Sequence, residues 1–196
     1  TNQKKSMITR ITPNLSLEAE TENTVYTLNY ALEKGVYHNS NADNYLDQDL
    51  SATANIIGNS RNRVDLSAAY RLGHDARDAT TGSSESAPLK FNLATLQGVY
   101  TYGGQESKGR LEFSGQYEDK QYSNFAATTD GKEYNRVGLG GIFYYRMTGK
   151  TSALFEATQS KINYDSANRD NTNTQFLTGV TWQATAKTTG QVKVGW

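Results

Sequence analysis

Apolar side chains recur at every second position through most of this chain, which is the spacing that places them on one face of an extended strand. The clearest run is Val64, Leu66, Ala68, Tyr70 and Leu72. No segment shows the 3.6-residue period of an amphipathic helix, so the chain is predicted to be all-β. The predicted strands follow ten such runs, at 11–19, 26–32, 46–56, 64–72, 94–102, 111–117, 137–145, 153–157, 176–184 and 192–196.

The alternate positions of these runs hold acidic and basic side chains. Strand propensity does not favour so many charges, so this face must contact water or form internal ion pairs. In a narrow barrel such residues would form cross-strand pairs that fill the lumen, and in a wider one they would line a pore and set its selectivity. The candidates for lining the lumen are Asp47, Asp49, Arg63, Asp65, Arg71, Arg110, Glu112, Glu118, Arg136, Arg146 and Glu156.

Short turns and longer loops alternate between the predicted strands. The strands have about 10–13 residues, which matches the ~9–11 residues of a tilted strand that spans a bilayer. This alternation is typical of an outer-membrane β-barrel, and the expected fold is a transmembrane antiparallel up-and-down β-barrel with about ten strands in this chain. The short turns are expected at 21–24, 58–60, 103–107, 148–150 and 187–190, and the longer loops at 34–44, 73–88, 123–132 and 165–173.

Tyrosines near the predicted strand ends are the residue type that forms aromatic girdles at the two membrane interfaces. We therefore expect lipid and lipopolysaccharide to surround the barrel at these side chains. The tyrosines concerned are Tyr37, Tyr45, Tyr102, Tyr117, Tyr122, Tyr134, Tyr144, Tyr145 and Tyr164.

Composition agrees with a sheet that has one apolar face. The 196 residues include 20 Lys and Arg and 20 Asp and Glu, and the mean hydropathy is −0.72. A net charge of zero argues against a nucleic-acid partner. Cysteine is absent, which excludes disulfides and thiolate metal sites within these residues. Residues 1–196 are interpreted as one outer-membrane β-barrel domain.

Enzymatic chemistry has one candidate, the adjacent His74 and Asp75. A carboxylate beside an imidazole can activate water, as in outer-membrane proteases, and Asp43 and Asp47 would complete such a site if the fold brought them close. The favoured interpretation is a solvated loop. The Asx residues of 165–173 lack the alternation and the closing glutamate of a calcium loop. No catalytic residue, metal or cofactor is expected.

Several strand-and-turn segments resemble the β-barrel porin 2 family of bacterial outer-membrane proteins. The segments are 25–30 (VYTLNY), 35–37 (GVY), 43–47 (DNYLD), 60–66 (SRNRVDL), 73–77 (GHDAR), 150–156 (KTSALFE) and 162–166 (INYDS). Members of that family are generally longer, and the likeness falls on their N-terminal part. This chain is therefore expected to be the N-terminal part of a larger barrel.

The resemblance implies a place in the outer membrane of a Gram-negative bacterium and a role in capsule or exopolysaccharide production, and hence in biofilm. It implies a non-enzymatic channel or export component, with polysaccharide and other export or surface-assembly proteins as partners. One alternative is a narrow structural barrel that anchors a surface assembly through its loops. The other is an enzyme of the outer-membrane protease type.

Overall fold

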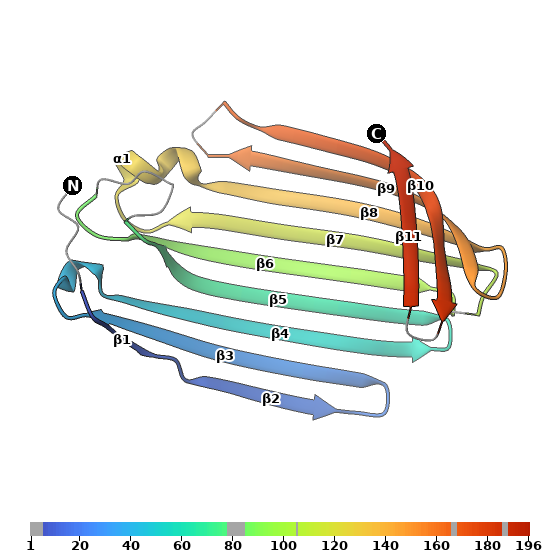
Figure 1. Cartoon of the computed structure of the whole chain (residues 1–196), viewed down its shortest axis with the longest axis horizontal. Helices are drawn as coiled ribbons and strands as arrows, with labels where there is room; N and C mark the ends of the chain where they lie inside the picture. The colour runs from blue at the N-terminus through green and yellow to red at the C-terminus, as the bar shows by residue number, and fades with distance from the viewer. Residues whose placement is uncertain (1–5, 78–84, 105, 166–167, 186–187) are drawn as a thin grey trace.

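The computed structural model describes residues 6–77, 85–104, 106–165, 168–185 and 188–196, which form one antiparallel sheet (Figure 1). Strands that are consecutive in sequence pair with one another, so the prediction of an all-β, up-and-down arrangement is confirmed. The strands are β1 (Ile8–Ile11), β2 (Asn14–Glu20), β3 (Thr24–Tyr37), β4 (Tyr45–Asn59), β5 (Asn62–Asp75), β6 (Leu89–Tyr102), β7 (Gly109–Tyr122), β8 (Tyr134–Arg146), β9 (Thr151–Tyr164), β10 (Asn171–Thr185) and β11 (Thr188–Gly195).

The structure has eleven strands where the sequence predicts ten, because the first predicted strand is broken at Pro13. Both β1 and β2 pair with β3, one after the other along its length. Proline has no backbone N–H to donate to a ladder, and its fixed φ interrupts the extended strand. The Pro13 carbonyl still accepts a hydrogen bond of 3.0 Å from the Leu32 N–H. The two strands thus form one interrupted edge.

The register separates the side chains into two faces. The apolar face consists of the even positions of β3–β6, the odd positions of β7–β9 and the even positions of β10 and β11, and the other positions form the polar face. At the centre of β6, for example, Leu96 lies between Ala68 of β5 and Tyr117 of β7. A slip of one residue in any pair would exchange its faces, so the alternation in the sequence defines the register.

Among the described residues, no second layer covers the apolar face. Leu96, Leu139 and Phe155 lie on this face and are 54%, 65% and 55% exposed. The buried apolar side chains of the described residues are on the polar face instead; they are Tyr45, Leu89, Phe91 and Leu154. In a water-soluble sheet the apolar face would pack against another layer.

The sheet is open. Its order runs from β1 and β2 at one edge to β11 at the other, so the described strands do not close into a barrel. In Figure 1 the sheet curls at its C-terminal side, where β10 bends and β11 runs at a steep angle to β3–β8. Closure needs a partner for both edges, which the described strands do not provide.

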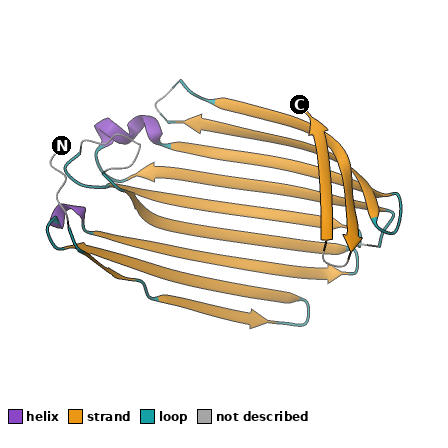
Figure 2. Cartoon of the chain, viewed as in Figure 1, coloured by secondary structure: helices purple, strands orange, loops and turns teal. Residues whose placement is uncertain are grey.

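The two ends of the sheet differ in their connections (Figure 2). The end with the connections β3–β4, β5–β6, β7–β8 and β9–β10, called here the loop end, includes the helical segments η1 (Asn41–Asp43), α1 (Ala126–Thr129) and η2 (Asp130–Lys132). The opposite end is the turn end. The strands extend into three of the predicted loops, since β3 continues to Tyr37, β5 continues to Asp75 and β10 begins at Asn171. None of the described helices is long and apolar enough to cross a membrane.

Candidate functional site

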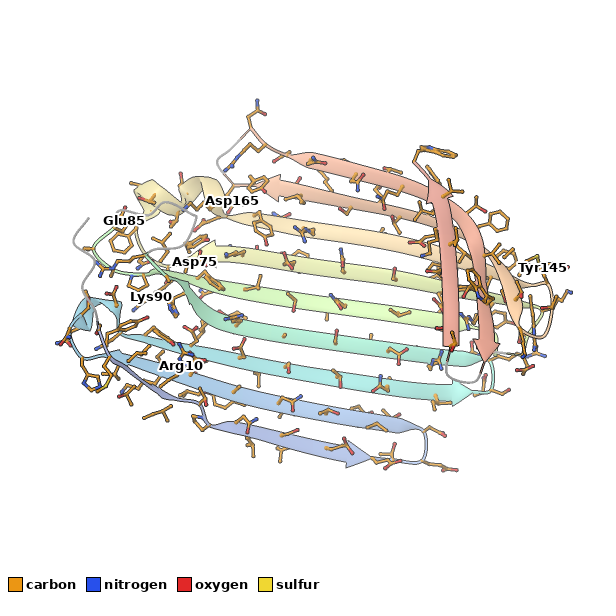
Figure 3. The ribbon with its side chains drawn as sticks, in the orientation of Figure 1. Arg10, Asp75, Glu85, Lys90, Tyr145 and Asp165 are labelled. Atoms are coloured by element: carbon orange, nitrogen blue, oxygen red, sulfur yellow. The ribbon has the colours of Figure 1, made fainter. Side chains whose placement is uncertain are left out.

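The eleven charged residues singled out in the sequence all lie on the polar face, because each has the parity of that face in the register. Ten of them form an ion pair, and the eleventh, Asp47, lies 2.8 Å from the His74 imidazole. They therefore form separate pairs rather than one cluster. Figure 3 shows side chains along the whole sheet, with Arg10 and Asp75, which are not among the eleven, labelled at the loop end.

A recurring unit of the polar face is a carboxylate held between a cation and a tyrosine. In one example the Arg136 guanidinium lies 3.6 Å from Glu118 Oε1, and the Tyr134 hydroxyl donates a hydrogen bond of 2.7 Å to the same oxygen. The Arg136 guanidinium also lies over the Tyr134 ring, at 5.6 Å from its centroid. We call these units triads; they are Arg10–Glu33–Tyr45, Lys120–Asp75–Tyr122, Arg136–Glu118–Tyr134 and Arg110–Glu112–Tyr144.

The triads satisfy the charge of each carboxylate locally. A carboxylate with a cation and a hydroxyl donor has most of its lone pairs in use, so it presents little free charge to a ligand. Three triads lie at the loop end, and Arg110–Glu112–Tyr144 lies at the turn end. The acidic and arginine members of two triads are among the lumen-lining candidates from the sequence, but Arg10, Glu33, Asp75 and Lys120 are not. Glu33, Asp75 and Lys120 occupy the alternate, polar-face positions of their strands, and this alternation in the sequence could have identified them.

Other ion pairs lie on or beside the polar face. Arg71 and Asp49 pair across β5 and β4 at 3.5 Å, and both are about half exposed, so the pair contributes at most about 1 kcal/mol. Lys193 of β11 reaches Glu156 of β9 at 2.5 Å and so links two strands that are not neighbours in the sheet. Arg63 and Asp65 pair within β5, and Arg146 at the end of β8 pairs with Glu106 of the β6–β7 connection.

Most of the tyrosines expected in the membrane girdles lie on the polar face, so that expectation is wrong for them. Tyr102, Tyr117 and Tyr145 do lie on the apolar face. Position near a strand end suggested a girdle, but parity decides which face a side chain occupies. The tyrosines placed on the polar face are Tyr37, Tyr45, Tyr122, Tyr134, Tyr144 and Tyr164.

The structure brings together half of the predicted His–Asp constellation. His74 Nδ1 lies 2.8 Å from Asp47 Oδ1, and the imidazole stacks on the Tyr45 ring at 3.9 Å between centroids. Asp75 does not contact them, because its carboxylate accepts a hydrogen bond of 2.8 Å from the Tyr122 hydroxyl. The pairing of β4 with β5 ends at Gln48 and Leu72, and beyond this pair the two strands separate around a groove of about 430 Å³. This separation allows His74 to contact Asp47.

Neighbouring long connections are tied to one another. Arg77 of the β5–β6 connection bonds Asp43 of η1, and Asn124 of the β7–β8 connection donates to the Pro88 carbonyl at 3.0 Å. Arg169 of the β9–β10 connection donates to the carbonyl of Gly131. The described loops therefore form one linked layer at the loop end. Among the described residues, no group of three or more His, Cys, Asp and Glu is placed to hold a metal ion.

The Asp43–Arg77 link gives this layer a defined pH dependence. The bidentate hydrogen bond from Arg77, at 2.5 Å to each carboxylate oxygen, lowers the pKa of Asp43 below its ordinary 3.8, and the Ser40 hydroxyl acts in the same direction against the effect of burial. The same bond raises the pKa of Arg77. Because the folded pKa of Asp43 is depressed, the link stabilises the layer above pH 3.8 and is lost as the pH falls through the folded value.

We expect Arg77→Gln to raise the pKa of Asp43 toward its ordinary value, since the substitution removes the donor that lowers it most. A carboxyl-carbon NMR titration of Asp43 in the folded protein measures this change. Arg71→Gln is the matched control, because Arg71 pairs with Asp49 and should leave the titration of Asp43 unchanged. Identical Asp43 titrations in the wild type and Arg77→Gln would show that the link has no electrostatic effect.

No protein-family model matches the chain, and no curated protein matches it.

Proposed function

We propose that this chain is part of an outer-membrane β-barrel that acts as a channel or export component for exopolysaccharide or capsular polysaccharide in a Gram-negative bacterium. The apolar face would contact lipid, and the polar face would line the lumen. Polymer would move along the polar face, while the linked loops at the loop end would guide or gate its passage.

The uncovered apolar face is the single observation that supports this proposal most strongly. Leu139 at 65% exposure and Phe155 at 55% belong to a contiguous apolar surface over most of the sheet. A surface of this extent is unfavourable in water and marks contact with a membrane or another protein. A lipid bilayer requires the reverse of a soluble sheet, with apolar side chains outside and polar ones inside.

The strand lengths fit the same environment. Strands β3–β10 have 13 to 15 residues each. At about 3.4 Å per residue they are about 45 Å long, and a tilt of about 45° reduces the span to about 32 Å, close to the ~30 Å hydrocarbon core. Their unpaired edges would have to pair with other strands, because a bilayer allows no open edge.

The choice of polysaccharide comes from the resemblance to the β-barrel porin 2 family, and the electrostatics of the polar face are compatible with it. Outside β2, whose Glu18 and Glu20 also lie on that face, most carboxylates and cations of the polar face are paired with one another, so no strong net field of one sign would retain a charged polymer. No motif among the described residues identifies a source of energy, so polymer movement would be driven from elsewhere.

A narrow structural barrel that anchors a surface assembly is the second candidate, and the triads favour it. Cation–carboxylate–tyrosine contacts such as Arg136–Glu118–Tyr134 link neighbouring strands and would rigidify a filled lumen. Liposomes that contain the full-length protein distinguish the two candidates. An open channel admits neutral oligosaccharides, and a filled barrel does not.

The export proposal is tested in cells in which the gene is disrupted, by locating the surface polysaccharide and measuring its total synthesis. Polymer that is made at the normal level but retained in the periplasm, with secretion restored by the full-length gene, is the expected result. Normal secretion by the disrupted strain would refute the export role. Reduced total synthesis without periplasmic polymer would refute it as well.

A further inference from the structure

The middle of the polar face is uncharged across five strands. Two neighbouring register rows cross β6–β10 there, and charged rows lie on both sides of them. Toward the loop end the next row contains Glu118 and Arg136, and toward the turn end it contains Glu112 and Glu156. The two rows are Gln97, Gln116, Gly138, Ser160 and Asn173, and Val99, Ser114, Gly140, Thr158 and Gln175.

These rows line a groove of about 420 Å³, together with Glu156, whose carboxylate is paired with Lys193. Two glycines of β8 give it its depth. A Cβ at Gly138 would lie 2.7 Å from the Gln116 side chain, and a Cβ at Gly140 would lie 2.6 Å from Ser114 Oγ. Any side chain at these positions would therefore displace the polar groups of β7 and fill the groove.

The amides and hydroxyls of the groove are available to a ligand. In the described part of the chain, the side chains of Gln97, Ser114, Gln116, Asn173 and Gln175 are exposed and have no hydrogen bond to another protein group. The charged residues on both sides are engaged in ion pairs. The free hydrogen-bonding capacity of this region therefore belongs to uncharged groups.

Amide side chains both donate and accept hydrogen bonds, which is what the hydroxyl groups of a sugar require. A polymer with a carboxylate on each repeat would need free cations, and the nearest ones, Arg136 and Lys193, are paired with Glu118 and Glu156. Binding an anion here would require breaking those pairs or burying its charge beside amides.

From this arrangement we infer that the groove is a binding site for an uncharged glycan segment, so that the polymer handled by this barrel is neutral along most of its length. The inference rests on the proposed function, because it names the substrate class of the same polar face. Exchangeable hydrogen bonds to Gln116 and Gln175 would hold successive sugars weakly enough to let the chain slide.

The test is calorimetric titration of the full-length protein in detergent micelles with neutral hexasaccharides, maltohexaose and cellohexaose, and with a hexamer of galacturonic acid. At least one neutral probe is expected to bind, and the acidic probe to bind at least about tenfold more weakly. Gln116→Ala with Gln175→Ala should weaken neutral binding about tenfold, as loss of two hydrogen bonds of ~0.7 kcal/mol each implies. Gln121→Ala, on the same strand but the apolar face, should not change it.

Two results would overturn the inference: neutral binding that is absent or unaffected by the double substitution, and acidic binding that equals or exceeds it. Gly140→Val supplies a second variant, because it fills the groove without removing a glutamine. Circular dichroism confirms that each variant is folded. Failure of this inference is distinguishable from failure of the export proposal, which is read from polymer location in cells. Glutamine-dependent binding together with normal secretion by the disrupted strain would refute export alone.

Discussion

Replacement of Leu96 by arginine is expected to destabilise the protein in a lipid bilayer by about 2–4 kcal/mol. Leu96 lies at the middle of β6 on the apolar face and is 54% exposed. If that face contacts lipid, the substitution places a cation near the bilayer midplane. If the face contacted water, an arginine at so exposed a position would change stability by about 0.5 kcal/mol or less.

The adjacent Gln97→Arg substitution is the matched control for this effect. Gln97 lies one residue further along the same strand, on the polar face, so its arginine would extend into the proposed lumen. We expect that change to cost about 1 kcal/mol or less. Denaturant titration of the full-length protein in lipid vesicles measures both variants. Equal and small costs for Leu96→Arg and Gln97→Arg would mean that no lipid contacts the apolar face.

The two faces could be predicted from the sequence because an alternation with a period of two assigns each side chain of a strand to one face. The run from Val64 to Leu72 alternates without interruption, and the structure pairs it in one register with both neighbouring strands. The eleven candidate residues on the polar face follow from the same parity. The triads could not be predicted in full, because residues far apart in sequence, such as Asp75 and Tyr122, meet only when register is known.

Other features depend on local departures from the regular sheet. Pro13 divides the first predicted strand in two, but the apolar positions keep their alternation on both sides of Pro13, so this alternation alone does not predict the break. His74 has the parity of the apolar face but reaches Asp47 on the polar face, because β4 and β5 separate beyond Leu72. Closure of the barrel cannot be read from the pattern either, since it depends on what pairs with the two edges of the sheet.

The groove between the charged rows could not be predicted from the sequence either. Gln97, Gln116 and Asn173 are separated by long stretches of chain, and polar residues of this kind are common in any strand that faces water. Only the register shows that they lie in one row beside Gly138 and between charged rows. A row of uncharged residues across a sheet results from the pairing of its strands, so the pattern within one segment of the sequence cannot predict it.

If lipid contacts one face of the sheet and water the other, the environment of the side chains changes with every residue along β6. The chain contains no cysteine, so single cysteines introduced in it can be labelled individually with a fluorophore such as bimane. Positions Ala94 and Leu96 lie on the apolar face, and Thr95 and Gln97 on the polar face. These four neighbours differ in parity but occupy nearly the same depth.

The most direct measurement is the quenching of each label in proteoliposomes by brominated lipid and by aqueous iodide. We expect strong quenching by brominated lipid and weak quenching by iodide at Ala94→Cys and Leu96→Cys, and the reverse at Thr95→Cys and Gln97→Cys. Iodide quenching of similar strength at all four positions, without quenching by the lipid, would place both faces in water and refute contact of the apolar face with lipid.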